Sequence, residues 1–146
     1  MPVKIYWNKK TGDVLVPTVA KTEAGFWIEV EPVERASLND VSSVSAAIRN
    51  AFGRVEIVVP TPTRSAFPKP VVLRHANVDS WISFEKQYSQ VSIVQDPDGH
   101  YMIEAYRRAL GGIGVEVDLD RTKLFSESLS LDGVIEELIS SMQGSL

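Results

Sequence analysis

Apolar residues recur near the start of the chain with the two-residue period of β-strands. The segment from Gly25 to Val33 shows this most clearly, because three apolar residues alternate with Trp27, Glu29 and Glu31. The spacing predicts a strand whose carboxylates lie on the solvent side and whose tryptophan is partly covered. The β-branched run from Val14 to Ala20 predicts a further strand.

A proline within the second run limits where that strand can lie. Pro17 has no backbone N–H to donate, so the run from Val14 to Ala20 is expected at a sheet edge or beside a bulge. An edge strand offers unpaired backbone groups to a second chain. One hypothesis is therefore a homodimeric structural protein that pairs through this strand.

Two segments show helical spacing instead. Apolar residues from Val41 to Phe52 recur every three or four positions and predict a helix, with Ser37 as its N-cap and Gly53 at its end. A second long helix is predicted from Leu131 to Met142, with Ser130 as its cap. Both helices carry one apolar stripe, so we expect them to cover a sheet.

The middle of the chain predicts shorter elements. Strands are expected at Val55–Val59 and Val71–His75, and a short helix is expected after a cap at Asp79. The sequence from Asp96 to Gly99, Asp-Pro-Asp-Gly, is the clearest hairpin signal, with a strand on each side. Val115 to Leu119 alternates apolar with acidic residues, which predicts one more strand.

Taken in order, these elements predict an α+β fold. We expect a mainly antiparallel sheet of about six strands, with two longer helices and one short helix packed against it. The length of 146 residues favours a single domain spanning residues 1–146. No apolar run is long enough to cross a bilayer and no secretory signal is visible, so a cytoplasmic protein that does not contact membranes is expected.

The composition of the chain argues against several kinds of chemistry and of binding partner. The chain has no cysteine, which excludes disulfides, thiolate nucleophiles and cysteine-ligated zinc. Its net charge is −4, from 19 acidic and 15 basic side chains. An acidic chain is poorly suited to direct nucleic-acid binding through phosphate neutralisation. It is suited to a basic protein surface, where charge complementarity speeds encounter.

The usual catalytic and metal patterns are missing from the sequence. His75 and His100 are far apart along the chain and neither has carboxylates at ligand spacing, so no metal site and no cofactor are expected. No G-x-S-x-G elbow occurs. The glycine-rich residues 111–114 are not followed by a helix pattern, so they predict a turn rather than a phosphate cradle. No catalytic residue is predicted.

Paired carboxylates leave two alternatives open. Glu29 with Glu31, and Glu116 with Asp118, each project from one strand face at a spacing of two residues. Such pairs can shift each other's pKa and carry out acid–base chemistry. More often they form the wet face of a half-buried strand, where they face solvent or a partner.

A stiff, proline-rich segment runs from Pro60 to Pro70 and holds four prolines. Prolines fix φ, so such a segment loses little further entropy when a partner binds. Arg64 could clamp a carboxylate or phosphate, or it could pair with a carboxylate of its own chain. Phe67 is expected to anchor the segment in the core. The polar groups that this frame presents are Thr61, Thr63, Arg64 and Ser65.

Four segments, taken in order, resemble the immunity proteins of contact-dependent growth inhibition. They are Gly25–Glu31, Val58–Ser65, Pro68–Leu73 and Ser80–Lys86, and the similarity extends over roughly residues 20 to 140. The resemblance implies a cytoplasmic, non-enzymatic inhibitor that binds a cognate toxin domain, often a basic nuclease. The shared Thr61–Arg64 motif then suggests a role in the fold. The candidate contacts are the acidic side chains of Glu29, Glu31, Asp96, Asp98, Glu116, Asp118 and Asp120.

The alternative hypothesis is a small ligand-binding or enzymatic domain. It uses the Pro60–Pro70 segment to hold an anionic ligand, with Arg64 beside Glu29 or Glu31. Whether the chain is a monomer is left open by the sequence.

Overall fold

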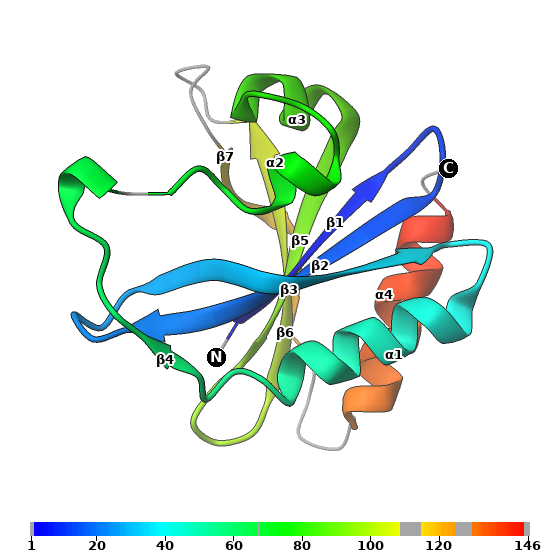
Figure 1. The fold of residues 1–146 in the computed structure, drawn as a ribbon. Coiled ribbons are helices and arrows are strands. Elements are labelled where there is room, and N and C mark those ends of the chain that lie inside the picture. Colours follow the sequence, from blue (N-terminus) through cyan, green and yellow to red (C-terminus); the bar gives the residue numbers. More distant parts are fainter. Residues whose placement is uncertain (1, 67, 109–114, 125–129, 145–146) are drawn as a thin grey trace.

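A computed structural model describes residues 2–66, 68–108, 115–124 and 130–144. In this part of the chain, seven strands form one sheet. Six of them follow the order β3-β2-β1-β5-β6-β7, and their pairings are antiparallel. The remaining strand, β4, pairs in parallel with the end of β2. The predicted α+β class with a mainly antiparallel sheet is confirmed (Figure 1).

The strands are β1 (Pro2–Asn8), β2 (Asp13–Thr22), β3 (Trp27–Ser37), β4 (Val58–Val59), β5 (Tyr88–Gln95), β6 (Tyr101–Arg108) and β7 (Val115–Leu124). The α-helices are α1 (Val41–Phe52), α2 (Val72–His75), α3 (Trp81–Gln87) and α4 (Leu131–Gln143), and a 3-10 turn spans Arg64–Ala66. Within the described ranges, no helix has the length and apolar character needed to cross a membrane. The predicted anchor Phe67 and the glycine-rich residues 111–114 lie outside the described residues.

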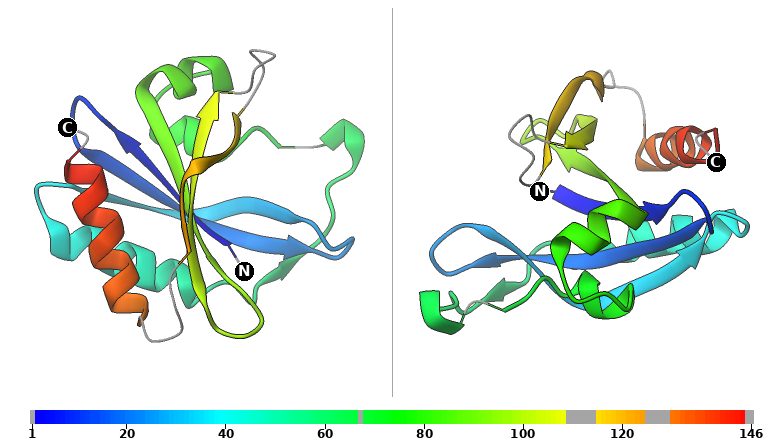
Figure 2. Two further views of the ribbon diagram at one scale, coloured as in Figure 1. Left: turned by 180° about the vertical axis from the view of Figure 1, so that it is seen from behind. Right: turned by 90° about the horizontal axis from the view of Figure 1, so that it is seen from above.

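The sheet is covered on both faces, and β1 contributes to both cores by its alternation. Its residues Val3, Ile5 and Trp7 are buried under the long helices α1 and α4. Tyr6 points the opposite way and packs with Leu15 beneath α2 and α3. The two long helices therefore share one face, as their apolar stripes predict, and Figures 1 and 2 show them side by side.

The position of β2 corrects one expectation and confirms its alternative. This strand lies inside the sheet, because it pairs with β3 along most of its length and with β1 and β4 near its two ends. The register shifts between Pro17 and Thr18, so a bulge accommodates the proline. The edge position predicted for Val14–Ala20 is wrong. Since these residues are buried, a homodimer that pairs through them is not supported.

The helix caps differ by a few residues from the predicted ones. Asp40, not Ser37, caps α1, because Ser37 still belongs to β3. Ser80, not Asp79, caps α3. Ser130 caps α4 as predicted. In each of these three helices the capping side chain accepts a hydrogen bond from the backbone N–H of the third residue after it.

Two variants test whether α1 is capped by Asp40 or by Ser37, the cap predicted from the sequence. We expect Asp40→Ala to lower the free energy of unfolding by about 1 kcal/mol, because the Ser43 N–H loses the carboxylate acceptor and keeps only the Asp40 carbonyl. Ser37→Ala should cost less, since the Ser37 hydroxyl bonds only the exposed Asn39 N–H. Urea denaturation of the two variants checks this, and an equal or larger loss for Ser37→Ala would contradict the assignment.

Two short apolar runs were assigned wrongly from sequence. Residues Val71–His75 were expected to form a strand, yet Val72–His75 is the helix α2. Of the strand expected at Val55–Val59, only Val58–Val59 pairs with the sheet. Runs with three or four apolar residues do not distinguish a buried strand from a buried helical turn, so tertiary packing decides.

The alternation predicted for Val115–Leu119 breaks at a bulge. Asp118 is 8% exposed and Leu119 is 80% exposed, the reverse of the expected pattern. Asp118 lies opposite the buried Ala105 and shares its face, and the register of β6 with β7 shifts after this pair, so Leu119 lies in the irregular stretch. The strand itself is confirmed.

Candidate functional site

A concavity in the described part of the chain lies between β3 and residues 68–71. It has two adjoining parts of about 630 Å³ and 310 Å³, and both parts are lined by Glu29 and by the Pro68–Pro70 segment. We call this feature the proline cleft. In Figure 1 the green segment that forms one wall runs from α2 alongside β3. The prolines have fixed φ angles, so this wall is stiff.

Glu29 lies at the junction of the two parts. The Tyr6 hydroxyl donates to its carboxylate, and the Lys4 ammonium lies 3.5 Å from the same oxygen. The Glu29 side chain is only 10% exposed. The expectation that Glu29 lies on a wet face is therefore wrong: its strand face is the one covered by α2, α3 and the proline segment.

Glu31 lines the larger part of the cleft. Its carboxylate accepts hydrogen bonds from Arg74, from His75 Nε2 at 2.8 Å and from the Val33 N–H at 2.9 Å. An ionised carboxylate can only accept, so His75 Nε2 carries the proton. The bond from His75, with those from Val33 and Arg74, lowers the pKa of the Glu31 carboxyl. Glu31 thus ties α2 to β3.

Aromatic side chains complete the smaller part. Trp81 meets the Tyr6 ring edge to face, at a centroid distance of 6.0 Å. Trp27 is 37% exposed, and the Lys21 ammonium lies 5.8 Å from its ring centroid. Val58 is also exposed and lies in the same cross-strand row, since Lys21 pairs with both Trp27 and Val58. Beside the cleft, therefore, two exposed apolar side chains flank Lys21.

This arrangement suits binding better than proton transfer. A general base needs a pKa near the working pH, whereas the pKa of Glu31 is lowered. Glu29 and Glu31 are each held by cations of their own chain, Lys4 for the first and Arg74 for the second. Through these ion pairs the two carboxylates hold the walls of the proline cleft in place. The lining of the cleft is partly apolar and includes the exposed Trp27.

The proline-segment motif divides into a structural part and an exposed part. Thr61 Oγ1 accepts a hydrogen bond of 2.8 Å from the Ala24 N–H and so fastens the segment to the β2–β3 turn. The Thr63 and Ser65 hydroxyls lie 3.4 Å apart. Arg64 is exposed, forms no ion pair with a described residue, and is not among the residues that line the cleft. This position supports neither a role of Arg64 as a clamp for an anionic ligand nor its pairing with a carboxylate of the same chain.

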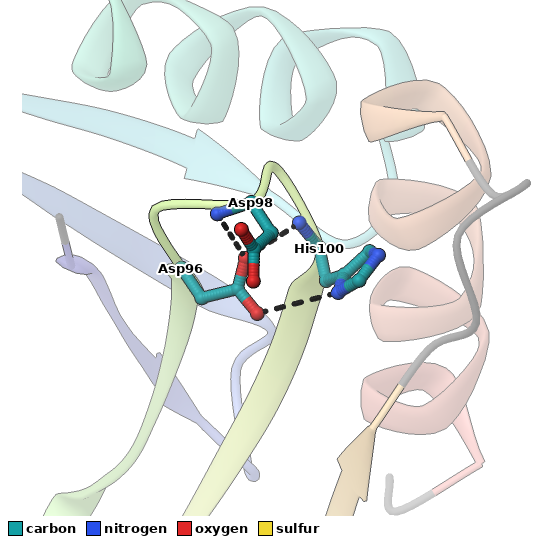
Figure 3. Close-up of side chains that lie close together, drawn as sticks. All are labelled: Asp96, Asp98 and His100. Carbon is teal, nitrogen blue, oxygen red and sulfur yellow. Dashed lines mark hydrogen bonds and ion pairs between the residues drawn. The ribbon is translucent and has the colours of Figure 1, made fainter.

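Asp96 and Asp98 lie at the tip of the β5–β6 hairpin. Asp96 Oδ1 accepts from the Asp98 N–H at 3.0 Å and from the His100 N–H at 2.9 Å, and Oδ2 lies 3.4 Å from His100 Nδ1 (Figure 3). Gly99 has φ +89°, as this tight turn requires. The three side chains lie near enough to share a cation. The turn contacts, however, explain the arrangement of the cluster by themselves.

The remaining acidic candidates lie on β7. Glu116 pairs with Arg107 of β6 at 3.1 Å. Asp118 is buried, accepts from the Asp120 N–H and lies 4.0 Å from Arg121. Asp120 is exposed. The seven acidic candidates therefore occupy three separate places: the proline cleft, the hairpin tip and β7.

Sequence reasoning found Glu29 and Glu31 but missed their partners. Lys4, Tyr6, Arg74 and His75 come from β1 and α2, and no spacing in the sequence connects them to β3. One weak signal existed, because Tyr6 is a polar aromatic residue within an apolar strand. Such a buried hydroxyl needs a partner.

Burial of this tyrosine predicts alkaline sensitivity. Burial, and secondarily the Glu29 charge, raises the pKa of Tyr6 well above its ordinary value of about 10. Burial and Asp13 raise the pKa of Tyr88 to about 12. Below about pH 10 both rings are protonated in the folded and unfolded states, so their contribution to stability is complete. Above it the unfolded chain ionises first, and the free energy of unfolding falls.

For Tyr6 the expected slope approaches about 1.4 kcal/mol per pH unit above pH 10. Urea denaturation at several pH values measures the slope, and Tyr6→Phe should make it shallower. Lys4→Gln is a matched control, because it also removes a contact to Glu29 but keeps the phenol. A slope unchanged in Tyr6→Phe would contradict the assignment.

Comparison with known proteins identifies the fold but not a family. No protein family model and no curated protein sequence matches the chain. A solved protein of unknown function from Neisseria meningitidis aligns with a TM-score of 0.63 at 12% identity, over 99% of this chain and 92% of that one. A chain of the CdiA-CT/CdiI toxin and immunity complex from Yersinia pseudotuberculosis aligns with a TM-score of 0.55 at 12% identity, over 97% and 95%. At this identity the likeness shows a shared fold that extends over nearly the whole chain.

Proposed function

We propose that this chain is an immunity protein that binds and neutralises the toxin domain of a contact-dependent growth inhibition system. The observation that carries the proposal is the fold that the chain shares, over 97% of its length, with a chain of a toxin and immunity complex. The order of segments from Gly25 to Lys86 resembles the same class of protein. We further propose that the chain acts in the cytoplasm and without catalysis.

The proline cleft is the surface that we assign to the toxin. It combines a stiff wall with an exposed tryptophan, and the exposed Val58 lies in the same cross-strand row on the other side of Lys21. Tryptophan and tyrosine dominate the energetics of protein interfaces, because they bury a large area at little entropic cost. The net charge of −4 favours encounter with a basic partner such as a nuclease.

Two measurements test the proposal together. The chain is expressed in cells that also produce the toxin domain encoded beside its gene, and growth is followed with and without it. The purified pair is then studied by isothermal titration calorimetry. We expect restored growth and a tight one-to-one complex. If the chain neither restores growth nor binds that domain, the proposed function is wrong.

A further inference from the structure

A second concavity lies on the opposite face of the sheet, between α4 and β7. Its volume is about 300 Å³. The described residues that line it include Trp7 from β1, Ile103 from β6 and Leu138 from α4, all of which belong to the core under the long helices. None of them lines the proline cleft. We call this feature the α4–β7 cavity.

Trp7 contributes a buried polar group whose hydrogen bond is missing. The residue is 4% exposed, and its indole Nε1–H has no hydrogen-bond partner among the described residues. A buried donor without an acceptor is destabilising, so such groups are nearly always paired in folded proteins. Because indole nitrogen can only donate, the group that completes this site must supply an acceptor atom.

The other lining residues define the rest of the complementary molecule. Val91, Ile103, Leu138 and Met142 present an apolar wall. The volume equals that of about ten waters at ~30 Å³ each, which suits a small organic molecule. An apolar wall of this extent favours a hydrocarbon part over a chain of ordered water.

Two cations lie at the mouth. Lys123 pairs in register with Ile103, which faces the core under α4, so the Lys123 side chain leaves the sheet on the side of the cavity. Arg121 also lines the cavity. Asp120 and Glu137 flank them, and both are exposed. Arg121 also lies 4.0 Å from the buried Asp118, so the mouth has no excess of positive charge. The hydrogen-bond donors therefore decide which end of a ligand is held.

We propose that the α4–β7 cavity binds a small amphipathic carboxylate. Its hydrocarbon part packs against Ile103, Leu138 and Met142. Its carboxylate accepts from the Trp7 Nε1–H and from the cations at the mouth, Arg121 and Lys123. A carboxylate offers the acceptors that Trp7 lacks, whereas an ammonium of the same length leaves the indole N–H unpaired. This site is independent of the toxin-binding function.

The tryptophan provides a direct test in the intact chain. A ¹⁵N-labelled sample gives one indole N–H signal for each of its 3 tryptophans, and Trp7→Phe identifies the one from Trp7. Octanoate is the probe, and octylamine is the matched control of opposite charge. We expect octanoate to move the Trp7 indole proton downfield in a saturable way, with the Trp27 and Trp81 signals unchanged. Octylamine should leave all three in place.

A surface variant tests the role of the cations, and Lys123→Gln alone is its control because it leaves the contact of Arg121 with Asp118 in place. Arg121→Gln with Lys123→Gln should weaken the apparent affinity for octanoate about tenfold, as the loss of a charge-assisted hydrogen bond implies. Three outcomes overturn the proposal: no shift of the Trp7 signal, an equal shift with octylamine, or an undiminished affinity in the double variant.

Discussion

Replacing Phe84 with alanine should destabilise the protein by about 3–5 kcal/mol, the cost of removing a fully buried phenylalanine. Phe84 is 1% exposed and is the centre of the core beneath α2 and α3. Its ring stacks on Tyr88 at 4.8 Å and meets Tyr6 edge to face at 5.1 Å. The cavity would lie among rigid aromatic rings, which cannot collapse to fill it.

Chemical denaturation followed by circular dichroism measures this loss. Ile82→Ala in the same helix is the control, because Ile82 is 66% exposed and its truncation should change stability by less than about 0.5 kcal/mol. If Phe84→Ala cost no more than Ile82→Ala, the packing of α3 on the sheet would be different from that described. A natively folded Phe84→Ala variant should also lose order around the cleft, since Trp81 stacks on the same ring at 5.1 Å.

The second large effect is expected on toxin binding. Trp27→Ala should raise the dissociation constant of the toxin complex by about 30-fold, which corresponds to about 2 kcal/mol for a central aromatic contact. The reason is the position of Trp27, which is 37% exposed at the rim of the proline cleft. Calorimetric titration of the variant with the toxin domain gives this constant.

Leu119→Ala is the matched control for binding. Leu119 is an apolar residue with 80% exposure, and it lies on β7, at the opposite edge of the sheet from β3. We expect its truncation to leave the dissociation constant unchanged. A weaker complex with Leu119→Ala and an unchanged one with Trp27→Ala would move the interface to β7 and its acidic residues. That result would leave the immunity function itself intact.

The sequence predicts the elements whose pattern is long. The stripe of α4 spans more than three turns, and both its cap and its buried face were found. The Asp96–Gly99 turn was equally clear, because a glycine at positive φ and an aspartate that accepts two backbone N–H groups are local features. Local chemistry decides such elements before any tertiary contact forms.

Features that depend on distant segments could not be found in this way. Pro17 leaves two positions open for the strand Val14–Ala20, a sheet edge or a bulge, and only the pairing of β2 with its neighbours decides for the bulge. Glu29 reads as a solvent-exposed carboxylate until β1 brings Tyr6 and Lys4 against it. The cleft depends on the packing of residues 68–71 along β3, which no periodicity encodes.

The pairing of β1 with β5 has a consequence for how the chain reaches its fold. Pro2 lies opposite Val94, so the sheet cannot grow beyond β1 until most of the polypeptide has been synthesised. Closing a loop of that length carries an entropic penalty before any contact repays it, and proteins rich in such non-local pairings fold slowly. On the ribosome, the first strand can therefore pair early only with β2, through Tyr6 and Trp7, and most of its length must wait for a neighbour made much later.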